Sequence, residues 1–458
     1  MTINMWLIAV WAALVPVAAL ALGRLKLGRD TFILLVYLQT LIYIDIAPTL
    51  ASVDVNSAMS SRYAWVQLWA LLLFQIPLLI TYVVTLRRRE RKLPEARAFR
   101  MSPTLLTLFI GGSVALGVGY FYVAADYGLL YRRLAEELST IQLTMGLVPF
   151  AIYRTFIEIG PFLMAVLFLI LRVQTNMSRS IRAWTWVGFA LTSVLYLGYA
   201  MINSRLVALT TLATIYGIAN VTARRSRRLS LGSAMGMVVL ALSGLYVLRV
   251  VSNVRLAFSS GDSIFALENF LPIAARQGQD DDTLRWRLNG VDLIAIIADN
   301  VEAQGPAMGT AWAVPFVLSL DPIVRTPFSV AAKTANLTSA KSWLLLRYSG
   351  VGKTDYYSCM LTDAYGNFSI YGFLLPAILL GFLLARATAA LRWSAKPAAI
   401  VIAAFVLTRA LPFEQEFGSL LFAWLKLVPF VLVALVFYPL RRGSADSQSP
   451  GSLQPVGL

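Results

Sequence analysis

Long apolar stretches recur along almost the whole chain, and they limit its fold more than any other feature. A helix of about 20 mostly apolar residues crosses a hydrocarbon core roughly 30 Å thick. Eleven such stretches occur: 6–22, 31–51, 64–86, 103–124, 145–171, 183–203, 206–221, 231–250, 368–387, 398–413 and 419–440. We therefore predict an all-α polytopic membrane protein with about 11 transmembrane helices.

Composition excludes the main soluble classes. The chain is 58% hydrophobic and 14% charged, whereas soluble domains are about 45–50% apolar and about 25% charged. A single core cannot hide this excess, because cores stop growing near roughly 250–300 residues. A lone cysteine excludes an intramolecular disulfide, and the absence of histidine excludes histidine-based metal sites and triads. We expect neither a cofactor nor a metal site.

The distribution of Lys and Arg predicts the orientation. Alternate connections carry 22 of the 39 basic residues, with the largest groups in 87–100 and 224–228. The short connections opposite, 52–63 and 125–144, carry only three. Basic residues mark the cytoplasmic side, so we predict that the N-terminus lies outside and the C-terminus in the cytoplasm; in a bacterial inner membrane the outside is the periplasm. The net charge of +16 then reflects topology, and no nucleic-acid partner is expected.

The spans divide the chain into four regions. Residues 1–250 hold transmembrane helices 1–8, 251–367 form a long periplasmic loop, 368–440 hold helices 9–11, and 441–458 form a disordered cytoplasmic tail rich in Ser, Gly and Pro. Within the loop, 283–301 and 306–320 look helical and apolar on one face. We expect these two stretches to be interfacial or re-entrant helices.

Several charged residues fall inside the predicted spans, toward the periplasmic face. A charge at membrane depth costs about 2.5–3.5 kcal/mol and generally marks a function or a paired site. Arg154 and Glu158 share one helix face, Arg205 opens span seven, and Arg409 nears the end of span ten, before Glu414. Guanidinium groups bind phosphate oxygens in a bidentate manner, which favours a lipid-linked phosphate or diphosphate substrate. The alternatives are an intrahelical ion pair in span five and arginines that anchor span ends by snorkelling.

The segment that leads into span nine resembles a known family. It contains Asp355-Tyr356-Tyr357, then LTDAYGNFSIYG over 361–372, and Gly381. Earlier stretches, 285–304, Gly309-Thr310, 321–327 and Asn203-Ser204-Arg205, add to the pattern. Together they resemble the bacterial oligosaccharide repeat-unit polymerases (O-antigen polymerase, Wzy-type), although Ser369 stands where that family usually has glycine.

The resemblance implies a GT-C-like glycosyltransferase of the bacterial inner membrane that acts at the periplasmic face to build O antigen or exopolysaccharide. A sugar hydroxyl of one repeat unit would attack the anomeric carbon of the growing chain, and polyprenyl diphosphate would leave. Its partners would be the lipid bilayer, the polyprenyl-diphosphate-linked oligosaccharide and a chain-length regulator. The candidate diphosphate-binding residues are Arg154, Arg205, Arg285, Arg287, Arg325 and Arg409. The candidate catalytic carboxylates are, in order of preference, Asp363, Glu158, Glu414 and Asp355.

Three other functions fit the layout less well. The related O-antigen ligase relies on a periplasmic histidine, which this chain lacks. Peptidoglycan polymerases carry motifs that are absent here. A polysaccharide or lipid transporter needs polar residues near the bilayer midplane and often has repeated halves, whereas the charges here lie toward one face.

Overall fold

The computed structural model is mostly helical. It describes residues 5–52, 55–90, 103–128, 146–173, 177–203, 205–223, 227–228, 289–320, 327–328, 331, 337, 339–350, 359–393, 397–412, 416–423 and 425. Six of its helical segments are long and apolar enough to cross a membrane: Leu7–Arg24, Thr31–Ala51, Ser57–Glu90, Leu106–Asp126, Val148–Val173 and Met360–Trp393. This architecture is compatible with the predicted all-α membrane protein. The total of about 11 transmembrane helices stays a prediction.

The other five predicted spans have different outcomes. The stretch 183–203 lies in a long helix that begins with two arginines, and 206–221 and 398–413 coincide with shorter apolar helices. Residues 231–250 lie outside the described part of the chain, as does most of 419–440. The tail 441–458 also lies outside it.

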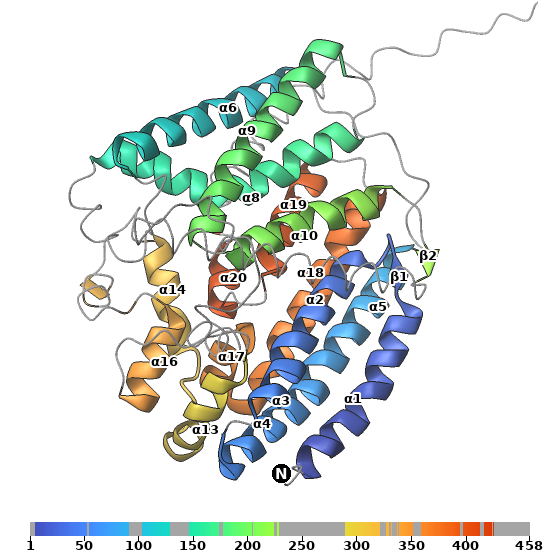
Figure 1. Ribbon diagram of the computed structural model, residues 1–458, viewed down its shortest axis with the longest axis vertical. Coiled ribbons are helices and arrows are strands. Elements are labelled where there is room, and N and C mark those ends of the chain that lie inside the picture. Colours follow the sequence, from blue (N-terminus) through green and yellow to red (C-terminus); the bar gives the residue numbers. More distant parts are fainter. Residues whose placement is uncertain are drawn as a thin grey trace, which may run out of the picture.

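The N-terminal part forms a bundle of three long rods (Figure 1). The first is α1 (Met5–Arg24); the second runs from α2 (Thr31–Thr40) through the π-helical η1 (Leu41–Ile46) into α3 (Ala47–Ala51); the third runs from α4 (Ser57–Ala70) through the π-helical η2 (Leu71–Gln75) into α5 (Ile76–Glu90). A π segment inserts an extra residue into a helix and often lies at a functional site. Both π segments fall within candidate membrane spans.

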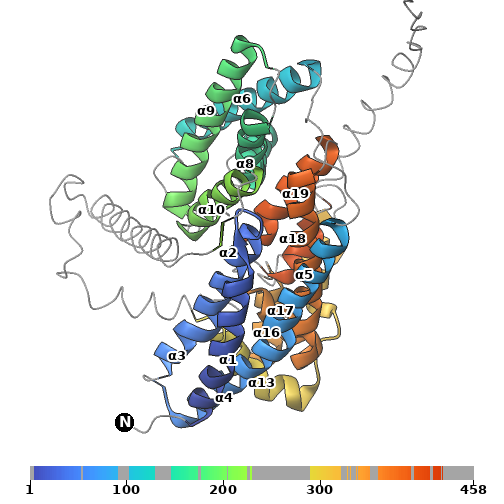
Figure 2. The same cartoon turned by 90° about the vertical axis from the view of Figure 1, so that its right-hand side faces the viewer.

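A second group of helices lies at the other end of the molecule, as both ribbon views show (Figures 1 and 2). It comprises α6 (Pro103–Asp126), α8 (Leu147–Val173), α9 (Arg179–Asn203) and α10 (Arg205–Thr222), which pack on one another. A short antiparallel pairing of β1 (Lys26–Leu27) with β2 (Arg227–Arg228) follows α1 and α10. This group supplies most residues of the site described below.

The C-terminal part joins these two groups. Its elements are α13 (Asp292–Gln304), α14 (Thr310–Leu320), α16 (Ala340–Ser349), α17 (Met360–Phe368), the 3₁₀ turn η4 (Ser369–Phe373), α18 (Leu374–Trp393), α19 (Pro397–Ala410) and α20 (Phe417–Ala423). Helices α13 and α14 lie within or overlap the two stretches predicted to be helical in the loop. They pack against α16 and α17. The described part of the long loop therefore belongs to the helical core of the C-terminal part.

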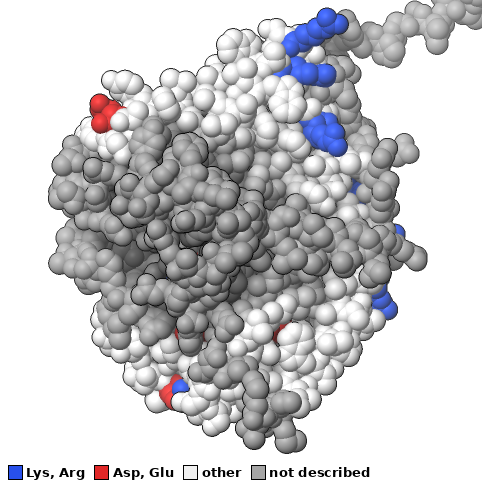
Figure 3. Space-filling model, in the orientation of Figure 1, with Lys and Arg blue, Asp and Glu red and all other residues white. Residues whose placement is uncertain are grey.

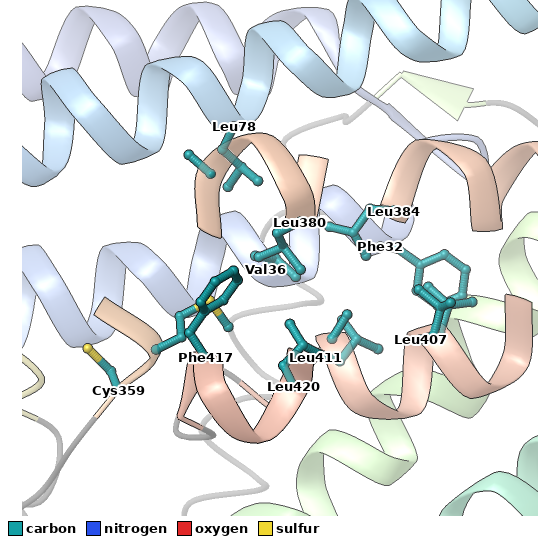
Figure 4. Packing of buried hydrophobic residues seen from close by; sticks show 14 of the residues in the cluster. Phe32, Val36, Leu78, Cys359, Leu380, Leu384, Leu407, Leu411, Phe417 and Leu420 are labelled. Atoms are coloured by element: carbon teal, nitrogen blue, oxygen red, sulfur yellow. The ribbon is translucent and has the colours of Figure 1, made fainter. Parts of the chain in front are cut away.

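Helix α18 forms the centre of the core. It packs on α5, α19, α10 and α2, and Figure 4 shows Leu380 and Leu384 of α18 near side chains of α2, α5, α19 and α20. Gly381 allows the close crossing of α18 and α5, because a Cβ there would lie 2.7 Å from the carbonyl oxygen of Leu78. A larger residue at this position would push the two helices apart.

The outer surface of the long helices is apolar. Leu20, Leu108 and Val194 are each at least 60% exposed, and most of the described surface in Figure 3 carries no charge, with basic side chains along its right-hand edge. Exposed apolar faces of this extent suit contact with lipid. The fold thus suggests a lipid bilayer environment.

Candidate functional site

Helices α8 and α19 bring together three of the residues predicted to form the site. On α8, the Arg154 Nε lies 3.0 Å from Glu158 Oε1. From α19, the Arg409 Nη2 donates a hydrogen bond of 2.7 Å to the main-chain oxygen of Glu158. We call Arg154, Glu158 and Arg409 the arginine cluster. It unites segments about 250 residues apart in the sequence, which no local pattern could establish.

A proline lies inside α8 one turn after the residues of the cluster. Pro161 has no N–H, so the main-chain oxygen of Ile157, four residues earlier, loses its helical donor. Gly160 beside it has no Cβ, and a Cβ there would overlap the ring of Tyr196 from α9. Gly160 therefore allows the ring of Tyr196 to pack directly on the backbone of α8.

Aromatic side chains line the same region. Tyr120 on α6 stacks on Tyr153 and Phe156 of α8, with ring centroids 5.4 and 4.3 Å apart. Tyr153 in turn meets Tyr199 of α9 edge to face at 6.4 Å. The hydroxyl of Tyr153 is buried and has no hydrogen-bond partner among the described residues. Tyr120, Tyr153 and Phe156 are almost completely buried, so these rings pack α6, α8 and α9 together.

The arginine cluster carries a net positive charge, since two guanidinium groups accompany one carboxylate. Its members differ in exposure: the side chain of Arg154 is 51% exposed and that of Glu158 27% exposed, whereas Arg409 is largely buried, with its guanidinium 5.8 Å from the ring of Phe405. Arg205 is the first residue of α10, which packs on α8. The side chain of Arg205 is not among the parts that the structure describes. The cluster therefore combines one accessible cation with one that is much less exposed.

Asp363, the first candidate for the catalytic base, is a buried helix cap. Its Oδ2 accepts hydrogen bonds from the Trp312 indole and from the Gly418 main-chain N–H, both at 2.7 Å, and its Oδ1 accepts one from the Phe417 N–H at 3.0 Å. Phe417 and Gly418 open α20, whose first N–H groups have no partner inside the helix. With no exposed surface, Asp363 has the contacts of a positioning residue.

A second buried carboxylate, that of Glu416, also binds main-chain N–H groups at the start of a helix. Glu416 accepts hydrogen bonds from the main-chain N–H groups of Ala340 and Lys341 at 3.0 Å each, at the start of α16. Burial raises the pKa of Glu416, and the N–H groups that bind its carboxylate oppose this effect. Asp363 thus connects α17 to α20, and Glu416, the residue before α20, connects α20 to α16.

Asn367 completes the connection of α17 to its neighbours. Its amide donates to the main-chain oxygen of Asp363 at 2.7 Å and accepts from the Ala311 N–H, near the start of α14, at 3.2 Å. The segment LTDAYGNF therefore organises α14 and α20 around α17. Gly372, a few residues on, leaves room for the main-chain oxygen of Ala364.

Ser369 adopts a backbone conformation that suits glycine. Its φ is 54°, in the region that a Cβ disfavours. This is the position where Ser replaces the glycine of the family that the sequence resembles. The other candidates, Arg285, Arg287, Arg325, Asp355 and Glu414, lie outside the described residues.

Sequence reasoning missed some residues of the site. A signal existed for two: a Gly-Pro pair inside an apolar run, directly after Arg154 and Glu158, indicates a kink. No sequence signal could have identified Trp312 or Tyr196, whose contacts are made across long separations.

No protein-family model, curated protein or solved structure matches the chain. The described residues contain no group of three or more cysteine, aspartate or glutamate side chains that could hold a metal ion. The fold defines the class, a helical protein with helices long and apolar enough to cross a membrane, and the site residues must carry any argument about activity.

Proposed function

We propose that the chain is a membrane glycosyltransferase that polymerises polyprenyl-diphosphate-linked oligosaccharide repeat units at the periplasmic face of the bacterial inner membrane. The observation that carries the proposal is the arginine cluster. Two guanidinium groups from separate helices accompany one carboxylate, beside aromatic rings, in a region predicted to face the periplasm. A diphosphate leaving group needs positive charge, and a sugar needs hydrogen-bonding and apolar surfaces.

Each member has a role in the proposed reaction. Arg154, which is exposed, and Arg409, which is held against α8, stabilise the negative charge that develops on the departing diphosphate. Arg205, at the start of α10, is a third donor to the same group. Glu158 accepts a hydrogen bond from the attacking sugar hydroxyl and takes its proton, a contribution of about 10²–10⁴ in rate. No nucleotide sugar, metal or cofactor takes part.

Asp363 acts in this scheme through the fold. By binding Trp312 and capping α20, it holds α20 in place; α20 follows Arg409 and Glu416 in the chain. The GT-C-like architecture, the chain-length regulator and the membrane orientation belong to the same proposal, and they rest on the sequence.

The proposal is tested by exchanging arginine for lysine. Arg409→Lys and Arg205→Lys keep the charge and lose the planar fork, so we expect glycan ladders in cells to collapse to single-repeat products. Loss of one such donor costs about 10²–10³ in rate. The matched control is Arg386→Lys on α18, whose side chain lies over the ring of Phe382 and lines a separate cavity of about 380 Å³.

The comparison is made at matched protein levels. Normal ladders from both Arg409→Lys and Arg205→Lys would mean that these arginines anchor helix ends, and the proposed site would be wrong. Collapse in the control as well would mean that the assay reports folding.

A further inference from the structure

A second polar cluster lies inside the N-terminal bundle, within candidate membrane spans. Asp45, in the π-helical η1, has no exposed surface, and its Oδ2 accepts a hydrogen bond of 2.7 Å from the Gln75 amide. Gln75 is the last residue of the π-helical η2 and is equally buried. Thus two π segments of neighbouring rods place a carboxylate and an amide in contact. Side chains placed by π segments are frequently functional.

The cluster contains more oxygen acceptors than donors. Asp45 Oδ1, Gln75 Oε1 and the hydroxyl of Tyr37 are buried and have no hydrogen-bond partner among the described residues. Tyr37 lies on α2, the helix that continues into η1. A buried carboxylate oxygen and a buried amide oxygen left without donors are both costly. A hydrogen-bond donor or a positive charge at these oxygens would remove the cost.

No described side chain supplies that positive charge. No arginine or lysine in the described part of the chain forms an ion pair with Asp45. The elements packed most closely on η1 are α2, α3 and α4. On α4, Arg62 is paired with Asp299, and Tyr63 donates to Asp292. Among the described residues, Asp45 therefore has only the neutral Gln75 as a side-chain hydrogen-bond partner.

The backbone around Asp45 is held in place from the other side. The Gln67 amide donates to the main-chain oxygen of Asp45 at 3.0 Å and to the Thr49 hydroxyl at 3.2 Å. Trp11 of α1 also donates to that hydroxyl, at 3.1 Å. Side chains of α1, α3 and α4 therefore hold this turn, and the unpartnered oxygens lie on a fixed backbone.

We propose that Asp45 and Gln75 form a binding site for one small monovalent cation, a sodium ion or a proton, inside the N-terminal bundle. Oxygen ligands of this kind suit a hard cation or a hydrogen-bonded proton. One carboxylate neutralises one positive charge, which favours a monovalent ion over a divalent one. The site is distinct from the arginine cluster and does not depend on the proposed polymerase activity.

The first test is labelling with dicyclohexylcarbodiimide, an apolar reagent that adds to protonated carboxyl groups in membranes and leaves a stable N-acylurea. Purified full-length protein is labelled over a pH series, in sodium chloride or in choline chloride, and the peptide containing Asp45 is weighed by mass spectrometry. We expect labelling that falls as the pH rises and that is absent in Asp45→Asn. If the cation is sodium, labelling falls about tenfold when sodium is about ten times its dissociation constant, and choline has no effect. If it is a proton, both salts give the same labelling.

Thermal unfolding gives a second measurement that needs no reagent to reach the site. A cation that binds only the folded protein raises the unfolding temperature, so the wild type should respond to sodium or to pH, and Asp45→Asn should lose that response. Gln75→Leu, which removes the amide oxygen, should weaken the response. The proposal is overturned if Asp45 takes up no label at any pH and the wild type and Asp45→Asn respond equally to salt and pH.

Discussion

Replacing Asp363 with asparagine tests whether this residue caps a helix or performs chemistry. The wild-type carboxylate receives three hydrogen bonds, from Trp312, Phe417 and Gly418. Asparagine keeps one oxygen and turns an NH₂ group toward at least one N–H donor. A hydrogen bond to a charged group contributes about 1.5–3 kcal/mol, and an orphaned buried donor costs about 1–3 kcal/mol. We expect a loss of about 2–3 kcal/mol, or about 30- to 150-fold in the ratio of folded to unfolded protein.

The assay combines thermal unfolding in detergent, followed by tryptophan fluorescence, with polymer formation per folded molecule. We expect Asp363→Asn to unfold several degrees below the wild type and to keep activity within about tenfold, less than the loss of a general base would cost. The control is Asp299→Asn, since Asp299 is 62% exposed in a surface ion pair worth about 0–1 kcal/mol. An Asp363→Asn protein as stable as this control, yet inactive, would refute the capping role and restore Asp363 as the base.

Three further predictions follow from the fold and the topology. Ser369→Gly should raise the unfolding temperature, because a glycine at φ 54° relieves strain of about 1 kcal/mol; an unchanged or lower temperature would contradict this. Gly160→Ala should destabilise the protein by about 1–3 kcal/mol through overlap with an α9 tyrosine, whereas Gly198→Ala, with open space around it, should have little effect; equal effects would contradict the close contact. In a cysteine-free background, a single cysteine in 277–282 should react with a membrane-impermeant reagent in intact cells, and one in 224–228 should not; the reverse pattern would overturn the orientation.

The sequence predicts the features that depend on local spacing. Apolar length identifies the six helices that are long and apolar enough to cross a membrane, and a separation of four residues predicts the Arg154–Glu158 contact, which the structure shows at 3.0 Å. It also identifies Arg409 as a residue of interest, because a charge in an apolar span needs a partner; Asp363 is identified only through the resemblance to the polymerase family.

The partners themselves could not be predicted. Arg409 binds a main-chain oxygen on α8, and Asp363 binds an indole and two main-chain N–H groups on α14 and α20. Main-chain groups have no residue-specific signature, and these contacts span long stretches of sequence. The π segments that place Asp45 and Gln75 could not be predicted either. One extra residue in a helical turn leaves no mark in a stretch that is apolar on nearly every side.

The most direct measurement of the central claim is polymer synthesis by the purified protein in liposomes. The substrate is a polyprenyl-diphosphate-linked repeat unit, supplied without nucleotide sugar and in excess EDTA. We predict a ladder of longer glycans, with one polyprenyl diphosphate released for each new glycosidic bond, and loss of both products in Arg409→Lys. Substrate that stays at one repeat unit, or polymer that forms only after Mg²⁺ is restored, would contradict the account.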